Sequence, residues 1–172
     1  MIKSKRIYLR RFTIDEADLL FQLDGDADVM KYITLGIART MDEVIEKSMP
    51  RILKSYQDKT DFGIFAAYLI NSEKYIGWFQ FEKDKEFEDS IEIGWRLKKQ
   101  YWGKGYATEV ATILCDLGIK MGKTIVARAM IKNIASIRVM EKAGLKFEKE
   151  FWVDYDPHSG SSDVLYKRSL IT

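Results

Sequence analysis

Hydrophobic and polar positions change their spacing several times along this 172-residue chain, and each change predicts a new element. Runs that are rich in aromatic and β-branched residues, or that alternate between apolar and polar residues, predict strands. These runs are 7–12, 62–70, 75–81, 90–97, 124–131, 145–153 and 163–170. The short polar connection 71–74 favours a hairpin between the two strands beside it, and the next strand extends that hairpin to a meander.

Apolar residues at helical spacing predict helices between these strands. The predicted helices span about 13–25, 40–56, 106–121 and 135–143. Thr13 with Glu16, and Thr40 with Glu43, have the spacing of capping boxes, so each pair predicts a helix N-terminus. Pro50 interrupts the second helix, and we expect a kink or a break there because proline cannot donate a backbone hydrogen bond.

The helix at 106–121 separates two strands, and such a crossover predicts that strands 90–97 and 124–131 are parallel. Residues 24–39 mix charged, apolar and glycine residues and favour a loop with one turn near 29–32. The order of elements predicts the α+β class: one domain over residues 1–172, with a mixed, mostly antiparallel central sheet of about six to seven strands flanked by helices.

The composition excludes several classes of protein. Apolar residues make up 47% of the chain and charged residues 31%, which is ordinary for a soluble globular protein. A net charge of +2 is too small for a nucleic-acid binder, and no apolar run approaches the ~20 residues that span a membrane. The N-terminus lacks the apolar segment of a secretory signal, so we expect a cytoplasmic protein. One His and one Cys offer no metal site, and Cys115 is expected to be a buried structural thiol.

A strand, a basic glycine-containing loop and a helix start follow one another over residues 90–109. Unpaired backbone N–H groups and the helix dipole converge at such a junction, so the pattern predicts an anion site. Gly103 and Gly105 let the backbone approach an anion without a Cβ atom in the way. Nearby lysines add positive potential, although each could also be a solvated surface residue; they are Lys98, Lys99 and Lys104.

The segment Gln100–Ala107 matches the Q/R-x-x-G-x-G/A signature of the GCN5-related N-acetyltransferase (GNAT) superfamily, and the chain resembles that superfamily over nearly its whole length. A second segment, Asn133–Leu145, is similar to the N-x-x-S-x-x-V-x-x-K-x-G-F pattern of the branch that contains ribosomal-protein N-terminal acetyltransferases and spermidine acetyltransferases. This resemblance implies the GNAT fold and an acetyl-CoA-dependent N-acetyltransferase.

The resemblance also implies which residues bind acetyl-CoA. The amides of Gly103, Lys104, Gly105 and Tyr106 would bind the pyrophosphate, and the backbone of Leu97 would pair with the pantetheine arm as an extra strand. The remaining expected cofactor contacts come from both motifs and are Lys98, Gln100, Ala107, Asn133, Ser136, Arg138 and Lys142. For Arg138 and Lys142, a solvated helix face is the alternative.

Glu92 is the expected general base, because transfer to an amine needs that amine neutral and the resembled branch has a glutamate on this strand. Strand alternation places Glu92, Gly94 and Arg96 on one face of the strand. A glutamate in an apolar strand is costly to bury unless it is paired or functional. A salt bridge to a neighbouring strand is therefore the alternative role of Glu92.

The leaving-group side departs from the wider superfamily. Many members have a tyrosine acid seven residues after the motif asparagine, and here that position is Met140, which has no proton to give. The resemblance to the ribosomal-protein branch implies that Ser136 acts as the acid on the CoA sulfur. A helix N-cap, or a simple hydrogen bond to the cofactor, is the alternative role of Ser136, and the reaction could also need no dedicated acid.

The resemblance therefore implies acetyl transfer to a primary amine, either a protein N-terminus or a small molecule, by direct attack in a ternary complex. The alternative is a sensor module that binds acyl-CoA without turnover. The acceptor should approach residues 24–39 and 154–163, where Asp154, Asp156 and Asp163 could attract a cationic amine or serve solubility alone. Three aromatic residues either line this site or belong to the core, namely Tyr32, Trp95 and Trp152. We expect a monomer or a homodimer.

Overall fold

The structure, a computed structural model, describes residues 2–56, 61–152 and 161–169. The chain divides into two compact units. The first unit comprises Met1–Glu82 and Trp95–Tyr106, and the second comprises Lys83–Gly94 and Ala107–Thr172. Strand β5 (Ser90–Leu97) contributes its first half to the second unit and its last three residues to the first.

Within the described residues, eight strands form one sheet in the order β1-β2-β3-β4-β5-β6-β8-β7. The strands other than β5 are β1 (Ile2–Lys3), β2 (Ile7–Arg11), β3 (Gly63–Leu69), β4 (Tyr75–Lys83), β6 (Thr124–Met130), β7 (Lys146–Phe151) and β8 (Asp163–Arg168). The α+β class and the mixed sheet are confirmed, with eight strands in place of the expected six to seven. The additional strand is the two-residue β1, which is too short to show any alternation in the sequence.

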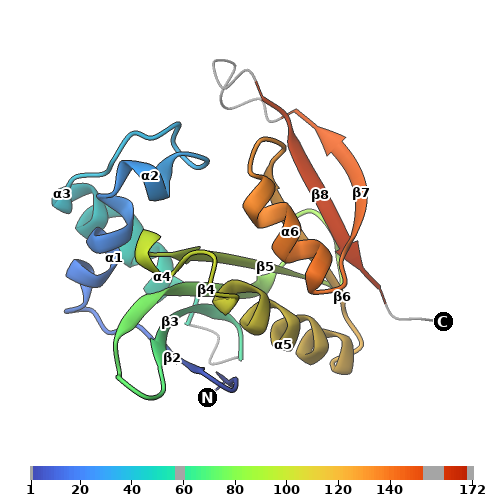
Figure 1. The fold of residues 1–172 in the computed structure, drawn as a ribbon, viewed down its shortest axis with the longest axis horizontal. Helices are drawn as coiled ribbons and strands as arrows, with labels where there is room; N and C mark the ends of the chain where they lie inside the picture. The colour runs from blue at the N-terminus through green and yellow to red at the C-terminus, as the bar shows by residue number, and fades with distance from the viewer. Residues whose placement is uncertain (1, 57–60, 153–160, 170–172) are drawn as a thin grey trace. The chain divides into compact units, whose positions relative to one another are not determined.

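The helices also follow the predicted order (Figure 1). They are α1 (Ala17–Asp24), α2 (Ala27–Met30), α3 (Met41–Glu43), the π-helix η1 (Val44–Ser48), α4 (Met49–Lys54), the 3₁₀ turn η2 (Lys99–Tyr101), α5 (Tyr106–Lys120) and α6 (Ile134–Lys142). The turn expected within 24–39 is the short helix α2, whose N-cap Asp26 accepts hydrogen bonds from the amides of Asp28 and Val29.

In the first unit, helices α1, η1 and α4 cover one face of the antiparallel strands β3 and β4 (Figure 1). Leu20 and Leu23 from α1 and Ile52 from α4 pack into one apolar cluster with Ile64 and Ala66 from β3. These two β3 residues are two positions apart, as strand alternation requires of residues on one face. The hairpin expected between β3 and β4 is confirmed.

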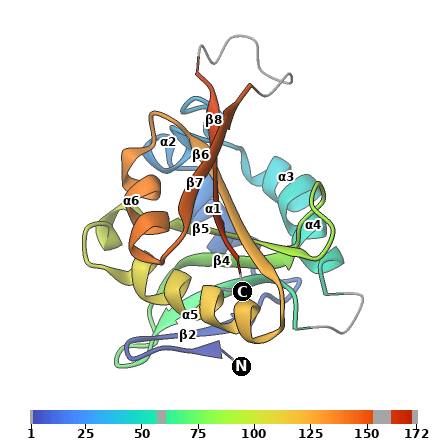
Figure 2. The same ribbon diagram turned by 90° about the vertical axis from the view of Figure 1, so that its right-hand side faces the viewer.

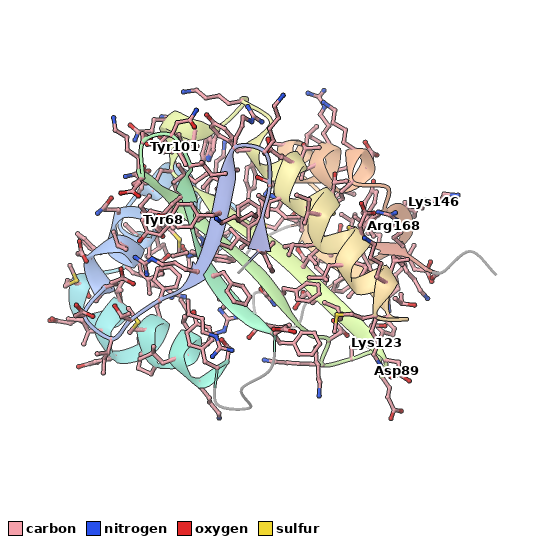
Figure 3. The ribbon with its side chains drawn as sticks, turned by 90° about the horizontal axis from the view of Figure 1, so that it is seen from below. Tyr68, Asp89, Tyr101, Lys123, Lys146 and Arg168 are labelled. Atoms are coloured by element: carbon pink, nitrogen blue, oxygen red, sulfur yellow. The ribbon has the colours of Figure 1, made fainter. Side chains whose placement is uncertain are left out.

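In the second unit, β5 and β6 run parallel through the helix α5, as expected from the crossover. An ion pair of 2.5 Å joins Asp89 and Lys123, the residues just before the two strands (Figure 3). The approach of α5 to the sheet is close, because a Cβ atom on Gly118 would lie 2.1 Å from the Cδ1 atom of Ile125. The antiparallel strands β8 and β7 extend this part of the sheet beyond β6 (Figure 2).

Of the two helix N-termini that capping boxes predicted, one is confirmed and the other lies further along the chain. Thr40 and Glu43 form the expected capping box. The helix expected from Thr13 begins only at Ala17, and its N-cap is Glu16. The carboxylate of Glu16 does accept from the Thr13 amide at 2.9 Å, but Thr13–Glu16 forms a separate turn ahead of the helix.

The irregularity expected at Pro50 takes the form of the π-helix η1, which directly precedes the helix α4 that contains this proline. A proline inside an α-helix lacks the N–H for its hydrogen bond and presses its ring against the carbonyl four residues earlier. The wider turn of a π-helix accommodates both effects without ending the helix. The chain therefore continues as one helical segment from Met41 to Lys54.

Candidate active site

The end of β5 is fixed in the first unit by two hydrogen bonds. The carbonyl oxygen of Leu97 accepts from the indole N–H of Trp102 at 2.7 Å. The amide of Lys98 donates to the carbonyl oxygen of Ile76 on β4 at 2.9 Å. The 3₁₀ turn η2 then leads into the predicted glycine loop, Trp102–Gly105. The expected sequence of strand, loop and helix start is thus present.

The two glycines of this loop adopt the left-handed conformation, with φ of 70° at Gly103 and 77° at Gly105. A Cβ atom on Gly103 would meet no atom of the described residues within 4 Å, and one on Gly105 would meet only the Nη2 atom of Arg6, at 3.5 Å. Glycine is therefore required by the backbone conformation, and the loop presents an open surface. The first turn of α5 follows at Tyr106, so backbone N–H groups and the helix dipole can serve an anion there.

The lysines around the loop have partners within the first unit. Lys98 donates to the side-chain oxygen of Gln22 at 2.8 Å, and Lys99 forms an ion pair of 2.5 Å with Asp28. Lys104 lies with its ammonium group 5.7 Å from the centre of the Tyr101 ring. Gln100 is exposed. Two of the three lysines thus hold the loop to α1 and α2, an arrangement that the sequence alone did not indicate.

The second motif begins α6 in the second unit. Asn133 is the N-cap residue, and its side-chain oxygen accepts from the amide of Ser136 at 3.2 Å. The alternative of Ser136 as N-cap is therefore wrong, because Ser136 lies three residues inside the cap. Arg138 and Lys142 are exposed, which fits both a cofactor contact and a solvated face, whereas Met140 is buried.

Glu92 forms the salt bridge that the sequence left as an alternative. Its carboxylate accepts from the Nη1 atom of Arg128 on the neighbouring strand β6 at 3.0 Å, and its side chain is 28% exposed. The parallel pairing of β5 with β6 ends at this residue, with Glu92 opposite Val126. Glu92 thus lies partly exposed at the last pair of residues that the two strands form, and the ion pair with Arg128 fixes its position.

Arg128 joins Glu92 to two further carboxylates on the connection between β4 and β5. Its guanidinium donates to Asp84 at 2.5 Å and to Glu86 at 3.1 Å, and Glu86 also binds Lys149 on β7. Burial would raise the pKa of Asp84, but the hydrogen bonds from Arg128 and from the amides of Phe87 and Glu86 lower it below its ordinary value. In the sequence, the only indication of this cluster was the charged residue Arg128 within the apolar run 124–131.

A second buried cluster surrounds Asp24 at the end of α1 in the first unit. Its carboxylate is 3% exposed and accepts from Arg96 on β5, from Arg39 at 3.3 Å and from the hydroxyl of Ser48 at 3.0 Å. The guanidinium of Arg96 also lies 5.0 Å from the centre of the Trp78 ring. Asp24 therefore ties α1, the segment that follows it and the helix around Ser48 to the end of β5.

The residues expected near the acceptor differ in how far they are exposed to solvent. Tyr32 and Trp95 are partly exposed, and Trp152 is 70% exposed, so Trp152 is not a core residue. The pKa of Asp163 is raised because the residue is partly buried. The residues Asp154 and Asp156, which were expected to attract the acceptor, lie outside the described residues.

Other expectations concern metals, membranes and the single thiol. Cys115 is fully buried, as expected, and burial raises its pKa to about 11. Within the described ranges, no group of three or more His, Cys, Asp or Glu residues is arranged so that it could hold a metal ion. Among the helices that the structure describes, none has the length and apolar character needed to cross a membrane.

The expected catalytic and cofactor-binding residues divide between the two units. The first unit contains Leu97, Lys98, Gln100, Gly103, Lys104, Gly105 and Tyr106. The second unit contains Glu92, Ala107, Asn133, Ser136, Arg138 and Lys142. The first unit contains an open glycine loop, and the second contains the helix α6 capped by Asn133 and, on β5, the ion-paired Glu92.

Comparisons with known proteins identify the family. The family model described as "Acetyltransferase (GNAT) domain" matches residues 6–146. An uncharacterized N-acetyltransferase from Bacillus subtilis, YnaD, is 30% identical over 166 residues, which cover 90% of this chain and 93% of that protein.

Solved structures agree with this match. A GNAT-family acetyltransferase from Bacillus anthracis has a TM-score of 0.81 and 27% identity, covering 98% of this chain and 97% of that one. RimL, a ribosomal L7/L12 alpha-N-protein acetyltransferase in complex with coenzyme A, has a TM-score of 0.79 and 17% identity, covering 97% and 96%. The chain belongs to the GNAT family of acetyltransferases.

Proposed function

We propose that the protein transfers an acetyl group from acetyl-CoA to a primary amine, either on a small molecule or at a protein N-terminus. The observation that carries this proposal is the glycine loop between β5 and α5, with its two left-handed glycines and open surface. Such a loop offers backbone N–H donors to a pyrophosphate, the most highly charged part of the donor after its ribose phosphate. RimL, which shares the fold, is known in complex with coenzyme A.

Four residues of the first unit would hold the pyrophosphate through their amides: Gly103, Lys104, Gly105 and Tyr106. The backbone of Leu97 would pair with the pantetheine arm, and its carbonyl oxygen keeps a second lone pair beside the bond from Trp102. In the second unit, Asn133 uses its side-chain oxygen for the helix cap, so its amide N–H₂ group remains the part suited to a pantetheine carbonyl.

The reaction is a direct attack of the amine on the thioester carbonyl carbon in a ternary complex. The C–N bond forms, the C–S bond breaks, and the nitrogen loses one proton. Glu92 takes that proton, directly or through a water molecule, and Arg128 keeps its carboxylate in place. The CoA thiolate leaves, and Ser136 supplies a hydrogen bond or a proton to the sulfur. Because a thiolate is itself a tolerable leaving group, the role of Ser136 as acid is less demanding than the role of Glu92 as base.

The test is release of free CoA thiol from acetyl-CoA in the presence of an acceptor panel. The panel contains polyamines, aminoglycosides, amino acids and peptides with free N-termini. We expect thiol release above background with at least one member, and mass spectrometry of that acceptor should show one added acetyl group. Binding of acetyl-CoA without release for any amine would contradict transfer and support a sensor module instead.

Gly105→Glu should abolish acetyl-CoA binding, because it adds bulk and negative charge where the pyrophosphate is expected. Gly122→Glu is the matched control: it places the same side chain on a left-handed glycine (φ of 74°) in open space, just past the other end of α5. Calorimetry with acetyl-CoA compares the two variants. Equal affinity of Gly105→Glu and the parent would refute the placement of the pyrophosphate.

A further inference from the structure

Arg6 contacts the glycine loop from a distant part of the sequence. It lies just before β2, in the same unit as the loop. Its Nη1 atom donates to the carbonyl oxygen of Lys104 at 3.1 Å, and its guanidinium carbon lies 4.4 Å from the centre of the Tyr106 ring. Apart from Gly105 and its two chain neighbours, its Nη2 atom is the one atom of the described residues within 4 Å of the position that a Cβ atom on Gly105 would occupy.

The bond to Lys104 restricts the direction of a neighbouring amide. A trans peptide is planar, so the C=O of Lys104 and the N–H of Gly105 point to opposite sides of the same plane. A guanidinium that holds the carbonyl on one side therefore holds the Gly105 N–H on the other. Glycines permit many backbone conformations, so a loop with two of them would otherwise lose entropy on binding an anion.

Arg6 is itself anchored at the backbone. Its carbonyl oxygen accepts from the amide of Ile70, just after β3, at 2.9 Å. The turn that contains it is closed by Ser4, whose amide and hydroxyl donate to the carbonyl oxygen of Ile7 at 2.8 and 3.1 Å. The side chain thus extends from a fixed point at the start of β2, and stacking on Tyr106 holds its plane at the start of α5.

We propose that Arg6 is a positioning residue for acetyl-CoA: it orients the Lys104–Gly105 peptide so that the Gly105 N–H faces the pyrophosphate. This inference rests on the proposed function. Arg6 acts on this peptide through the hydrogen bond from its Nη1 atom to the Lys104 carbonyl oxygen. Its positive charge also compensates the carbonyl dipole at this point of the loop.

The experiment compares Arg6→Met and Arg6→Lys with Lys5→Met, a matched control that removes the same charge from the exposed neighbouring residue. Three ligands separate the parts of the donor: CoA, dephospho-CoA, which lacks the 3′-phosphate, and pantetheine, which lacks the pyrophosphate as well. Calorimetry measures the first two, and a chemical-shift titration measures the weaker third ligand. Thermal unfolding of each variant reports whether it folds.

We expect Arg6→Met to weaken CoA and dephospho-CoA equally, by about three- to tenfold, the effect of one lost hydrogen bond. Pantetheine should bind as it does to the parent, and Lys5→Met should leave all three affinities unchanged. Arg6→Lys should recover only part of the loss, because an ammonium keeps a donor and the charge but not the planar stacking on Tyr106.

Several outcomes would overturn the inference. Unchanged CoA affinity in Arg6→Met would remove any role for Arg6, and a loss confined to CoA would mean that Arg6 binds the 3′-phosphate directly. An equal loss for pantetheine would indicate a general structural role. Full recovery in Arg6→Lys would favour charge alone. Failure of the parent protein to bind CoA at all would overturn the proposed function together with this inference, so the two failures are distinguishable.

Discussion

At the residue scale, Glu92 combines two features that are usually found apart. It is a partly exposed carboxylate, 28% open to solvent, and it is held by Arg128 at 3.0 Å. Arg128 is in turn held by Asp84, so the position of Glu92 depends on a buried partner rather than on its own packing. A carboxylate fixed in this way would lose little side-chain entropy in the proposed role of base.

Glu92→Gln tests the proposed base. The amide keeps the shape of the side chain and an acceptor for Arg128 but cannot take a proton, so we expect kcat to fall by about 10²- to 10⁴-fold with acetyl-CoA affinity unchanged. The fall should be largest at low pH, where the amine is most fully protonated. Steady-state rates between pH 6 and 9 measure this fall in kcat.

Glu86→Gln is the matched control for Glu92→Gln, because Glu86 also binds Arg128 but is about half exposed. A pH–rate profile of Glu92→Gln that follows the parent would eliminate Glu92 as the base.

The sequence indicates those features of single residues whose reasons are local. Gly103 and Gly105 are glycines because of their own φ angles, and burial along β5 alternates from Ile91 through Glu92 to Ile93, as expected of a strand. Arg6, Asp24 and Arg128 escaped prediction because each acts on a residue far away in the chain. Arg6, for example, lies 98 positions from Lys104. Pairing over such separations is decided by the packing of elements and leaves no periodic signal.

At the element scale, the close approach of β4 to the end of β5 shapes the first unit. A Cβ atom on Gly77 of β4 would lie 2.1 Å from the carbonyl oxygen of Arg96 and 2.8 Å from the Cα atom of Leu97. Next to it, the register of β3 and β4 shifts between Ala67 and Tyr68. The composition of these strands predicted them, but it did not predict the register shift. A glycine within an apolar run indicates that another segment approaches closely, but it does not indicate which segment that is.

Gly77→Ala should therefore destabilise the protein by about 2–4 kcal/mol, from backbone strain at φ of 145° together with overpacking against backbone atoms that cannot rotate away. Urea unfolding measures the midpoint and slope. Gly103→Ala is the control, because its φ is also positive but its surroundings are open, so only the backbone cost of about 1–2 kcal/mol applies. Equal losses in the two variants would show that crowding at Gly77 contributes nothing.

At the scale of the whole molecule, carboxylates held by arginines link stability to pH. Asp84 has a side chain that is 1% exposed and a pKa lowered by Arg128 against the effect of burial. The hydrogen bond from Arg10 likewise lowers the pKa of Glu16, although burial opposes it. A group whose pKa is lower in the folded protein than in the unfolded chain stabilises the fold above the unfolded pKa, and this stabilisation is lost as the pH falls through the folded value.

We accordingly expect the melting temperature of the parent to fall as the pH decreases from about 5 to about 3, the range that spans the ordinary pKa values of Asp and Glu, and to keep falling towards the lower folded values. In Arg128→Met, Asp84 keeps its burial but loses its main partner, so its pKa should rise. Its contribution to the acid-induced fall should then shrink or reverse, because protonation at low pH relieves the buried charge. At pH 7 the unpaired buried carboxylate should cost about 3–5 kcal/mol of the free energy of unfolding. Calorimetric melts over this pH series measure both effects.

Two further variants separate the buried carboxylate from the other charges around Arg128. Lys149→Met removes a partly exposed cation that binds Glu86, and it should change stability by less than about 1 kcal/mol at any pH in the series. Arg128→Met with Asp84→Asn removes the charge that was left unpaired, so it should regain much of the stability at pH 7 and should gain none from protonation at position 84 at low pH. If the double variant is as unstable at pH 7 as Arg128→Met, the packing of the Arg128 side chain, and not its charge on Asp84, is what stabilises the fold here.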